Sequence, residues 1–236
     1  MADPFAQLDR GALEWPGEAY GESVEGVPLR VWMPVSEGPA PLIVAAIHGN
    51  EQEATVVLSA ALRGVPPGER RCAVVLAANP DGALIGTRGN ARGVDLNRNF
   101  ATRNWGPPLP GELPTGSAPS SEPETRALAA LIQRLAPPFI ISVHSDLACV
   151  DDPGPTAIGR ELSQRSGLPL VAGVGYPTPG SFGTWCAERN IPIVSTGRIV
   201  SGSRSSTMHE ARIQLSRHSM RRATRFRRVC SRWHAG

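Results

Sequence analysis

The chain has 236 residues, of which 41% are hydrophobic and 19% are charged, a composition typical of one globular domain or at most two small ones. Its longest apolar runs, such as residues 42–47, are far too short to span a bilayer. The first ten residues lack the basic start and apolar stretch of a secretory signal, and none of the four cysteines forms a C-x-x-C pair. We therefore expect a cytoplasmic protein without a disulfide framework.

The charge is unevenly distributed, and all 24 basic residues are arginines. Residues 1–196 carry 14 arginines and 20 acidic residues, a net charge of −6. Residues 197–236 carry 10 arginines and one acid, Glu210, so their +9 brings the whole chain to +3. Such a break can mark a nucleic-acid-binding tail, but no interleaved aromatic pattern supports one here. Nucleic acid is therefore not an expected partner.

Hydrophobic periodicity predicts strands and helices in alternation. Short apolar runs predict strands at 29–33, 42–47, 73–78, 139–143, 170–174 and 191–196. Helices are predicted at 54–63, 158–166 and 184–189, and a further one is opened by a capping box at 121–124 and ended by Pro137. Residues 79–82 predict a turn, and residues 83–120 a long loop. We expect a single α/β domain over residues 1–196, with a mixed, mostly parallel sheet flanked by helices.

Two histidines directly follow predicted buried strands: His48 and His144. Ligands of open α/β sheets bind just beyond the carboxyl ends of strands. Glu51 lies three residues after His48, on the turn into a helix. Two histidines and one glutamate form the ligand set of catalytic zinc sites that keep a fourth position open for water. The pattern alone leaves a purely structural role for both histidines open.

The long loop adds three arginines among asparagines: Arg88, Arg92 and Arg98. Planar guanidinium groups bind carboxylates through two parallel hydrogen bonds, and a neighbouring amide adds a further donor. The loop can therefore be a binding site for a carboxylate. A solvated basic loop is the alternative.

Several motifs occur in an order that resembles the zinc carboxypeptidase family. They are H-G-N-E at 48–51, N-P-D-G at 79–82, G-V-D-L-N-R-N-F at 93–100, S-E-P-E-T at 121–125, V-H at 143–144 and Y-P-T-P-G-S-F-G-T-W-C at 176–186. The resemblance covers residues 10–196 and is strongest to the family's amidases of murein peptides. It implies hydrolysis, in the cytoplasm, of the γ-D-glutamyl–meso-diaminopimelate bond in small peptides released from the cell wall.

The resemblance also implies roles for single residues. His48, Glu51 and His144 would bind one Zn²⁺ per chain. Asn97 and Arg98 would hold the terminal carboxylate of the substrate, and Arg88 would stabilise the developing oxyanion, with Arg92 as a weaker candidate for substrate binding. The stretch that contains Tyr176 and Ser181 would shape the pocket around the substrate side chain.

One element of the family pattern is missing. The family has a Thr-x-Glu motif whose glutamate serves as general base, and this glutamate should fall near position 197, where the sequence has Gly197 and Arg198. The atypical segment 197–236 begins at the same place. It can be a product of a reading-frame shift, the end of a degenerate enzyme, or a purposeful basic tail.

Three functions follow from these observations. The first is a murein peptide amidase, impaired by the lack of the general base. The second is a catalytically inactive homologue that binds metal or peptide, and the third is an acyl-amino-acid deacylase of the same clan.

Overall fold

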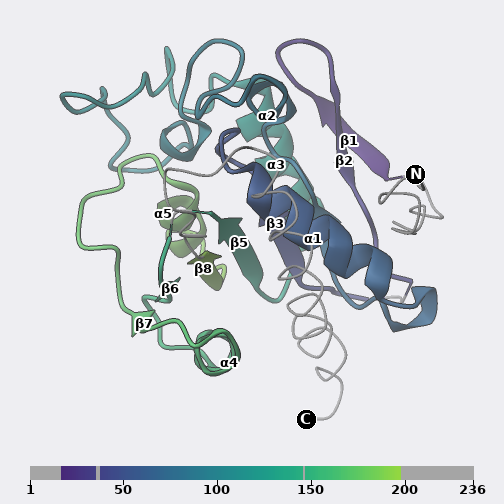
Figure 1. The fold of residues 1–236 in the computed structure, drawn as a ribbon. Coiled ribbons are helices and arrows are strands. Elements are labelled where there is room, and N and C mark those ends of the chain that lie inside the picture. Colours follow the sequence, from purple (N-terminus) through teal and green to yellow (C-terminus); the bar gives the residue numbers. More distant parts are fainter. Residues whose placement is uncertain (1–16, 36–37, 146, 198–236) are drawn as a thin grey trace, which may run out of the picture.

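A mixed sheet runs through the middle of the molecule in the computed structural model, which describes residues 17–35, 38–145 and 147–197 (Figure 1). The strands lie in the order β4-β3-β5-β8-β6-β7. All neighbours pair in parallel except β6 and β8, which are antiparallel. The predicted α/β fold with a mostly parallel sheet is confirmed. The strands are β3 (Leu42–Ala45), β4 (Ala73–Val75), β5 (Ile140–His144), β6 (Val150–Asp151), β7 (Leu170–Val171) and β8 (Ile193–Gly197).

Helices cover both faces of this sheet, and strand β3 shows why its sequence is apolar throughout. Leu42 and Val44 pack in one cluster with α3 (Pro123–Leu135) and α5 (Phe182–Ala187). Ile43 and Ala45 pack in a second cluster with α1 (Gln52–Gly64) and α4 (Ala157–Ser166). Side chains alternate between the two faces of a strand, so a strand covered on both sides is apolar at every position.

A short antiparallel hairpin of β1 (Glu18–Glu22) and β2 (Pro28–Val31) lies beside α3. Gly21 lets it approach closely, because a Cβ there would lie 2.6 Å from the Cβ of Ala127 on α3. Trp32 then bridges to Val74 and joins the hairpin to the edge of the main sheet. Strand β1 was not predicted, since its glycine, glutamates and single tyrosine form no apolar run.

Two predictions for the long loop and its borders were wrong. Residues 79–82 do not form a simple turn. They begin α2 (Pro80–Ile85), whose N-cap Asn79 accepts a hydrogen bond from the Gly82 amide, while proline occupies the first turn. The predicted capping box is also absent, because the N-cap of α3 is Glu122 and its side chain makes no capping bond. Two short 3₁₀ turns, η1 (Pro67–Glu69) and η2 (Leu96–Arg98), complete the described elements.

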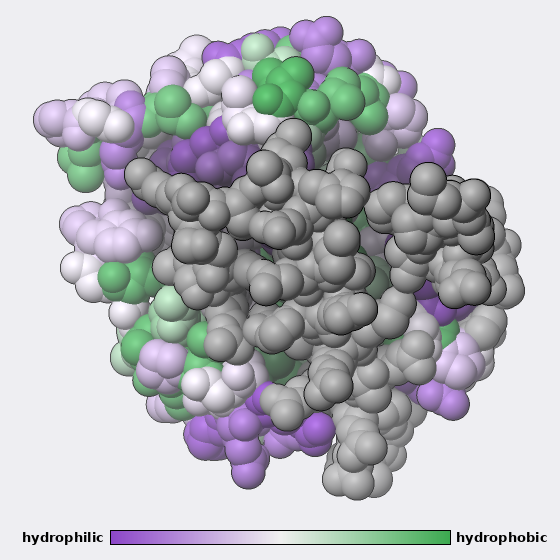
Figure 2. All heavy atoms as spheres, viewed as in Figure 1, coloured by the Kyte–Doolittle hydropathy of each residue, from purple (hydrophilic) through white to green (hydrophobic). Residues whose placement is uncertain are grey.

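The coloured part of the surface in one view is mixed in character. Figure 2 shows hydrophobic side chains in patches separated by hydrophilic ones on the face seen in Figure 1. No helix within the described ranges has the length and apolar character needed to cross a bilayer. The predictions for residues 198–236 lie outside the described residues.

Candidate metal centre and substrate cavity

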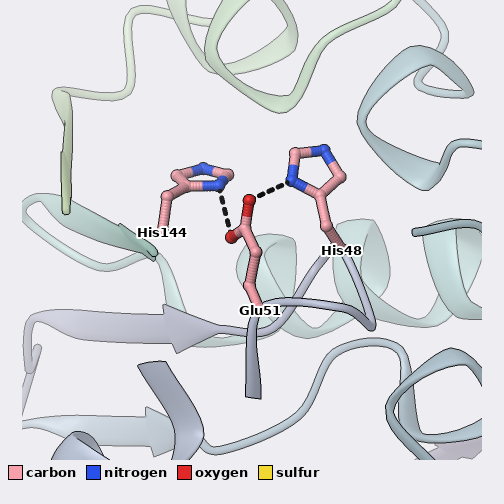
Figure 3. A group of neighbouring side chains, drawn as sticks. All are labelled: His48, Glu51 and His144. Carbon is pink, nitrogen blue, oxygen red and sulfur yellow. Dashed lines mark hydrogen bonds and ion pairs between the residues drawn. The ribbon is translucent and has the colours of Figure 1, made fainter. Parts of the chain in front are cut away.

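His48, Glu51 and His144 converge at the carboxyl ends of β3 and β5 (Figure 3). These strands are parallel neighbours, so the turn after β3 and the last residue of β5 meet at one edge of the sheet. The Glu51 carboxylate lies between the two rings. Its Oε1 is 2.8 Å from Nδ1 of His48, and its Oε2 is 2.9 Å from Nδ1 of His144. The structure thus brings together the three side chains that the spacing had singled out.

The chemistry of this group fits a zinc ion. One ligand atom of each residue lies within 4.8 Å of the others, and His48 and Glu51 are buried. Both histidines turn the same ring nitrogen, Nδ1, toward the carboxylate, so all donors face one point. Two imidazoles and one carboxylate are the protein ligands of catalytic zinc sites.

Two charged residues outside the three-residue group, Asp95 and Arg88, contact His48. The Nε2 atom of His48 lies 3.4 Å from Oδ1 of Asp95 and 2.8 Å from Nη2 of Arg88. Arg88 in turn donates from Nε to Oδ2 of Asp95 at 2.9 Å. Such outer-shell carboxylates fix the tautomer and orientation of a ligating histidine. Sequence reasoning missed Asp95, although it is the single acid of the 93–100 motif, which also holds Arg98.

The pKa values in this network are strongly perturbed. Burial lowers the pKa of His48, but hydrogen bonds to Asp95 and Glu51 outweigh burial and raise it above the ordinary value. Burial raises the pKa of Glu51, but hydrogen bonds to His144 and His48 outweigh it and lower the pKa to about 2. For Asp95 too, burial is outweighed by the hydrogen bond to His48 and by neighbouring positive charge, and its pKa is lowered. Both carboxylates are therefore ionised at neutral pH and suit a bound cation.

A cavity of about 610 Å³ opens beside these three residues. Asn97 and Arg98 line it, and both lie on η2. Arg98 is buried: its Nη1 donates to the Asn97 carbonyl, its Nη2 lies 3.8 Å from Oε1 of Glu112, and its Nε has no hydrogen-bond partner among the described residues. Asn97 accepts from the Phe182 amide through Oδ1 at 2.8 Å, which leaves its NH₂ group as a donor. This corner of the cavity can bind a carboxylate.

Comparison with known proteins places this site in a family. The zinc carboxypeptidase profile matches residues 70–150. Murein peptide amidase A of Escherichia coli strain K12 is 45% identical over 206 residues, covering 80% of this chain and 84% of that protein. The chain belongs to the zinc carboxypeptidase family. The amidase of the same name from Vibrio campbellii is 40% identical over 203 residues, covering 80% of this chain and 82% of its own.

Solved structures of the family share the fold. The crystal structure of murein-tripeptide amidase from Escherichia coli O157 matches with a TM-score of 0.85 at 38% identity, over 98% of this chain and 97% of that one. Bovine thrombin-activatable fibrinolysis inhibitor matches with a TM-score of 0.68 at 20% identity, over 91% of this chain and 90% of that one, which is a likeness of fold alone. The predicted family is confirmed.

Of the other residues with roles implied by the family resemblance, three line the cavity and one does not. Arg88, Tyr176 and Ser181 line the cavity, with Tyr176 60% exposed. Ser181 is also the N-cap of α5, since its hydroxyl accepts from the Thr184 amide. Arg92 is not among the lining residues. Its guanidinium group is mostly exposed and lies 3.3 Å from the Glu122 carboxylate, so the geometry gives its predicted contact with substrate no support.

The position of the predicted general base is the last residue of β8, Gly197, which pairs with His144. A Cβ at this position would lie 2.0 Å from the carbonyl oxygen of His144. The backbone therefore approaches His144 more closely than a side chain at position 197 allows.

Gly49, inside the H-G-N-E turn, is a sensitive point. A Cβ there would lie 2.1 Å from the carbonyl carbon of Gly82, because the turn packs against the backbone of α2. We expect Gly49→Ala to force this turn away and to destabilise the protein by about 1–3 kcal/mol, with weakened zinc binding. Thermal unfolding and metal content measure both effects. Gly106→Ala is the matched control, since a Cβ there has no neighbour within 4 Å, and equal behaviour of the two variants would contradict the prediction.

Zinc affinity should depend on pH through His48. Zinc requires an unprotonated Nδ1, and the pKa of His48 is raised above 6.5, so protons compete with zinc at a higher pH than for an ordinary histidine. We expect affinity to fall as the pH drops through the neutral range, earlier than it would with an ordinary histidine. Competition with a chelator of known affinity measures the zinc affinity at each pH. Asp95→Asn should shift the decline in affinity to lower pH. An affinity that stays constant over this range would contradict the prediction.

Proposed function

We propose that this chain is a zinc-dependent amidase that hydrolyses the γ-D-glutamyl–meso-diaminopimelate bond of murein peptides. The observation that carries this proposal is the 45% identity to murein peptide amidase A over 80% of the chain, together with a cavity that combines a zinc-type donor set with a carboxylate-binding corner. We also propose that it acts in the cytoplasm on peptides recycled from the cell wall.

Each residue in the cavity would then have one task. His48, Glu51 and His144 would hold zinc, which when bound polarises the scissile carbonyl and activates a water molecule. Arg98 and Asn97 would bind the terminal carboxylate and so position the peptide. Arg88, already oriented by Asp95, would place positive charge where the oxyanion develops.

The second candidate is a homologue that binds zinc and peptide without turnover. The observation that favours it is Gly197, which offers no carboxylate where the family pattern has its general base. Loss of a general base costs about 10² to 10⁴ in rate. Binding and turnover therefore have to be measured separately. The deacylase alternative has less support, because both curated relatives compared above are murein peptide amidases.

The experiment uses the zinc-loaded chain with the tripeptide L-alanyl-γ-D-glutamyl-meso-diaminopimelate. Release of diaminopimelate above the rate in buffer would support the amidase. Peptide bound without release would support the inactive homologue, and no binding would contradict both.

The carboxylate-binding corner gives a sharper test. We expect Arg98→Met to weaken tripeptide binding roughly 10- to 100-fold, because charge-assisted hydrogen bonds are lost. A tripeptide amidated at its terminal carboxylate should bind the unaltered chain with a similar loss and be insensitive to the substitution. Titration calorimetry measures all four affinities. Arg92→Met is the matched control, as it removes an exposed arginine outside the cavity, and an equal loss in this variant would contradict the assignment.

A further inference from the structure

Three adjacent strands contribute one polar row to the cavity. Ser142 of β5 pairs with Ser195 of β8, and Ser195 pairs with Asp151 of β6. Residues paired across a sheet present their side chains to the same face. All three residues line the cavity next to the metal centre. The row therefore combines two hydroxyl groups and one carboxylate. Such a wall suits a polar group of the substrate better than an apolar side chain.

The carboxylate of Asp151 is incompletely paired. Its Oδ1 is buried and has no hydrogen-bond partner in the described part of the chain. None of the ion pairs found among the described residues includes it. Burial and repulsion from Asp152 raise its pKa, and attraction to His144 opposes this only in part. A buried acceptor without a donor lowers the stability of the folded state by about 1–3 kcal/mol. A hydrogen-bond donor on a bound ligand would remove this cost.

The neighbouring acid, Asp152, makes the hydrogen bonds that hold this part of the chain together. Asp152 accepts hydrogen bonds from the amides of Gly154 and Thr156 and from the Thr156 hydroxyl. Its carboxylate fixes the turn that leads into α4 and is fully used. Of two adjacent carboxylates, Asp152 holds the loop together, and Asp151 lines the cavity with one acceptor oxygen left unpaired.

The substrate supplies a matching group. If the terminal carboxylate binds Arg98 and the scissile carbonyl lies at the metal centre, the side chain of the C-terminal residue has to occupy the rest of the cavity. Gly183 widens the α5 side, since it contributes no side chain to the lining. Diaminopimelate ends in an ammonium group beside a carboxylate, and an ammonium group carries three donors.

We propose that Asp151 binds the ammonium group at the far end of the substrate's C-terminal side chain. This inference rests on the proposed function, because it concerns selection among peptides in the same cavity. Asp151 is a specificity residue in this assignment and takes no part in bond cleavage. Discrimination arises because a peptide without the ammonium group leaves the half-buried carboxylate of Asp151 unpaired.

The test compares the affinities of two tripeptides for the zinc-loaded full chain by titration calorimetry, so it does not depend on turnover. One peptide ends in meso-diaminopimelate, and the other ends in L-2-aminopimelate, which differs only by the missing distal amino group. We expect the first to bind roughly 10- to 100-fold more tightly. In Asp151→Asn, a nearly isosteric change, the ratio should fall to below about threefold, because removal of the charge weakens binding of the first peptide.

Controls separate this role from a structural one. Glu18→Gln removes one negative charge from an exposed residue of β1 outside the cavity and should keep the full ratio. Asp151→Asn should keep its zinc content and unfold at the same temperature or higher, since an unpaired, half-buried charge is removed. A tripeptide ending in L-lysine, which has the ammonium group without the distal carboxylate, should show the same sensitivity to Asp151→Asn.

The outcomes are distinct. If the unaltered chain binds both pimelate peptides equally, or if Asp151→Asn keeps the ratio, the assignment of Asp151 is overturned while the proposed function stands. If the chain binds none of the peptides, the proposed function fails and the inference fails with it. A ratio that collapses only in the Asp151 variant supports the inference.

Discussion

Glu51→Gln is expected to lower the zinc affinity of the chain by more than about 100-fold, beyond the 10- to 100-fold typical of losing an outer-shell partner. The carboxylate contacts both histidines, and its pKa of about 2 keeps it ionised throughout the neutral range. Glutamine keeps the shape but replaces one oxygen by an NH₂ group, which cannot bind a cation. The two imidazoles alone lack the negative charge of the three-ligand site. Metal content after dialysis measures the effect.

The matched control is two residues away. Glu53→Gln makes the same chemical change on the first turn of α1, where Glu53 accepts a hydrogen bond from Ser145 and lies outside the three-residue group. It should keep one zinc per chain. Zinc retained in the Glu51 variant would contradict the metal site, and zinc lost in both variants would indicate a general disturbance of this turn.

The candidate metal ligands and the strands beneath them could be predicted because their signals are local. Strand β3 is covered on both faces, so its apolar run is continuous, and His48 follows that run directly in sequence. The structure refines this picture, since β3 ends at Ala45 and His48 lies in the turn beyond it, while His144 is the last residue of β5. The fold and the position of the two histidines at the carboxyl ends of neighbouring strands therefore follow from patterns of hydrophobicity and spacing.

Other parts of the site depend on contacts between distant segments. Asp95 orients both His48 and Arg88, but these partners are 47 and seven residues away along the chain, and the spacing itself predicts neither contact. Asp151 lies in a two-residue strand that is too short to give a periodic signal. It reaches the cavity only because β6 pairs with β8. The departure of Arg92 from the cavity likewise reflects its contact with Glu122, 30 residues further on.

Gly197→Glu should raise turnover of the murein tripeptide by about 10² to 10⁴ relative to Gly197→Gln. The resemblance implies a glutamate near this position, and a carboxylate here could take a proton from the attacking water and return it to the leaving amine. Position 197 is at the end of β8 and pairs with His144, one of the three residues of the candidate metal centre. The initial rate of diaminopimelate release, at equal zinc content, measures the difference.

The glutamine variant is needed because the substitution has a steric cost. A Cβ at position 197 would meet the carbonyl oxygen of His144 at 2.0 Å and its carbonyl carbon at 2.6 Å, so the end of β8 has to move in either variant. Both variants carry the same extra bulk, and only one carries the acid. A gain specific to Gly197→Glu would show that the metal centre and the cavity are competent and that the missing carboxylate limits the chain. Equal rates in the two variants, with zinc bound in both, would mean that a carboxylate at position 197 does not act as the base.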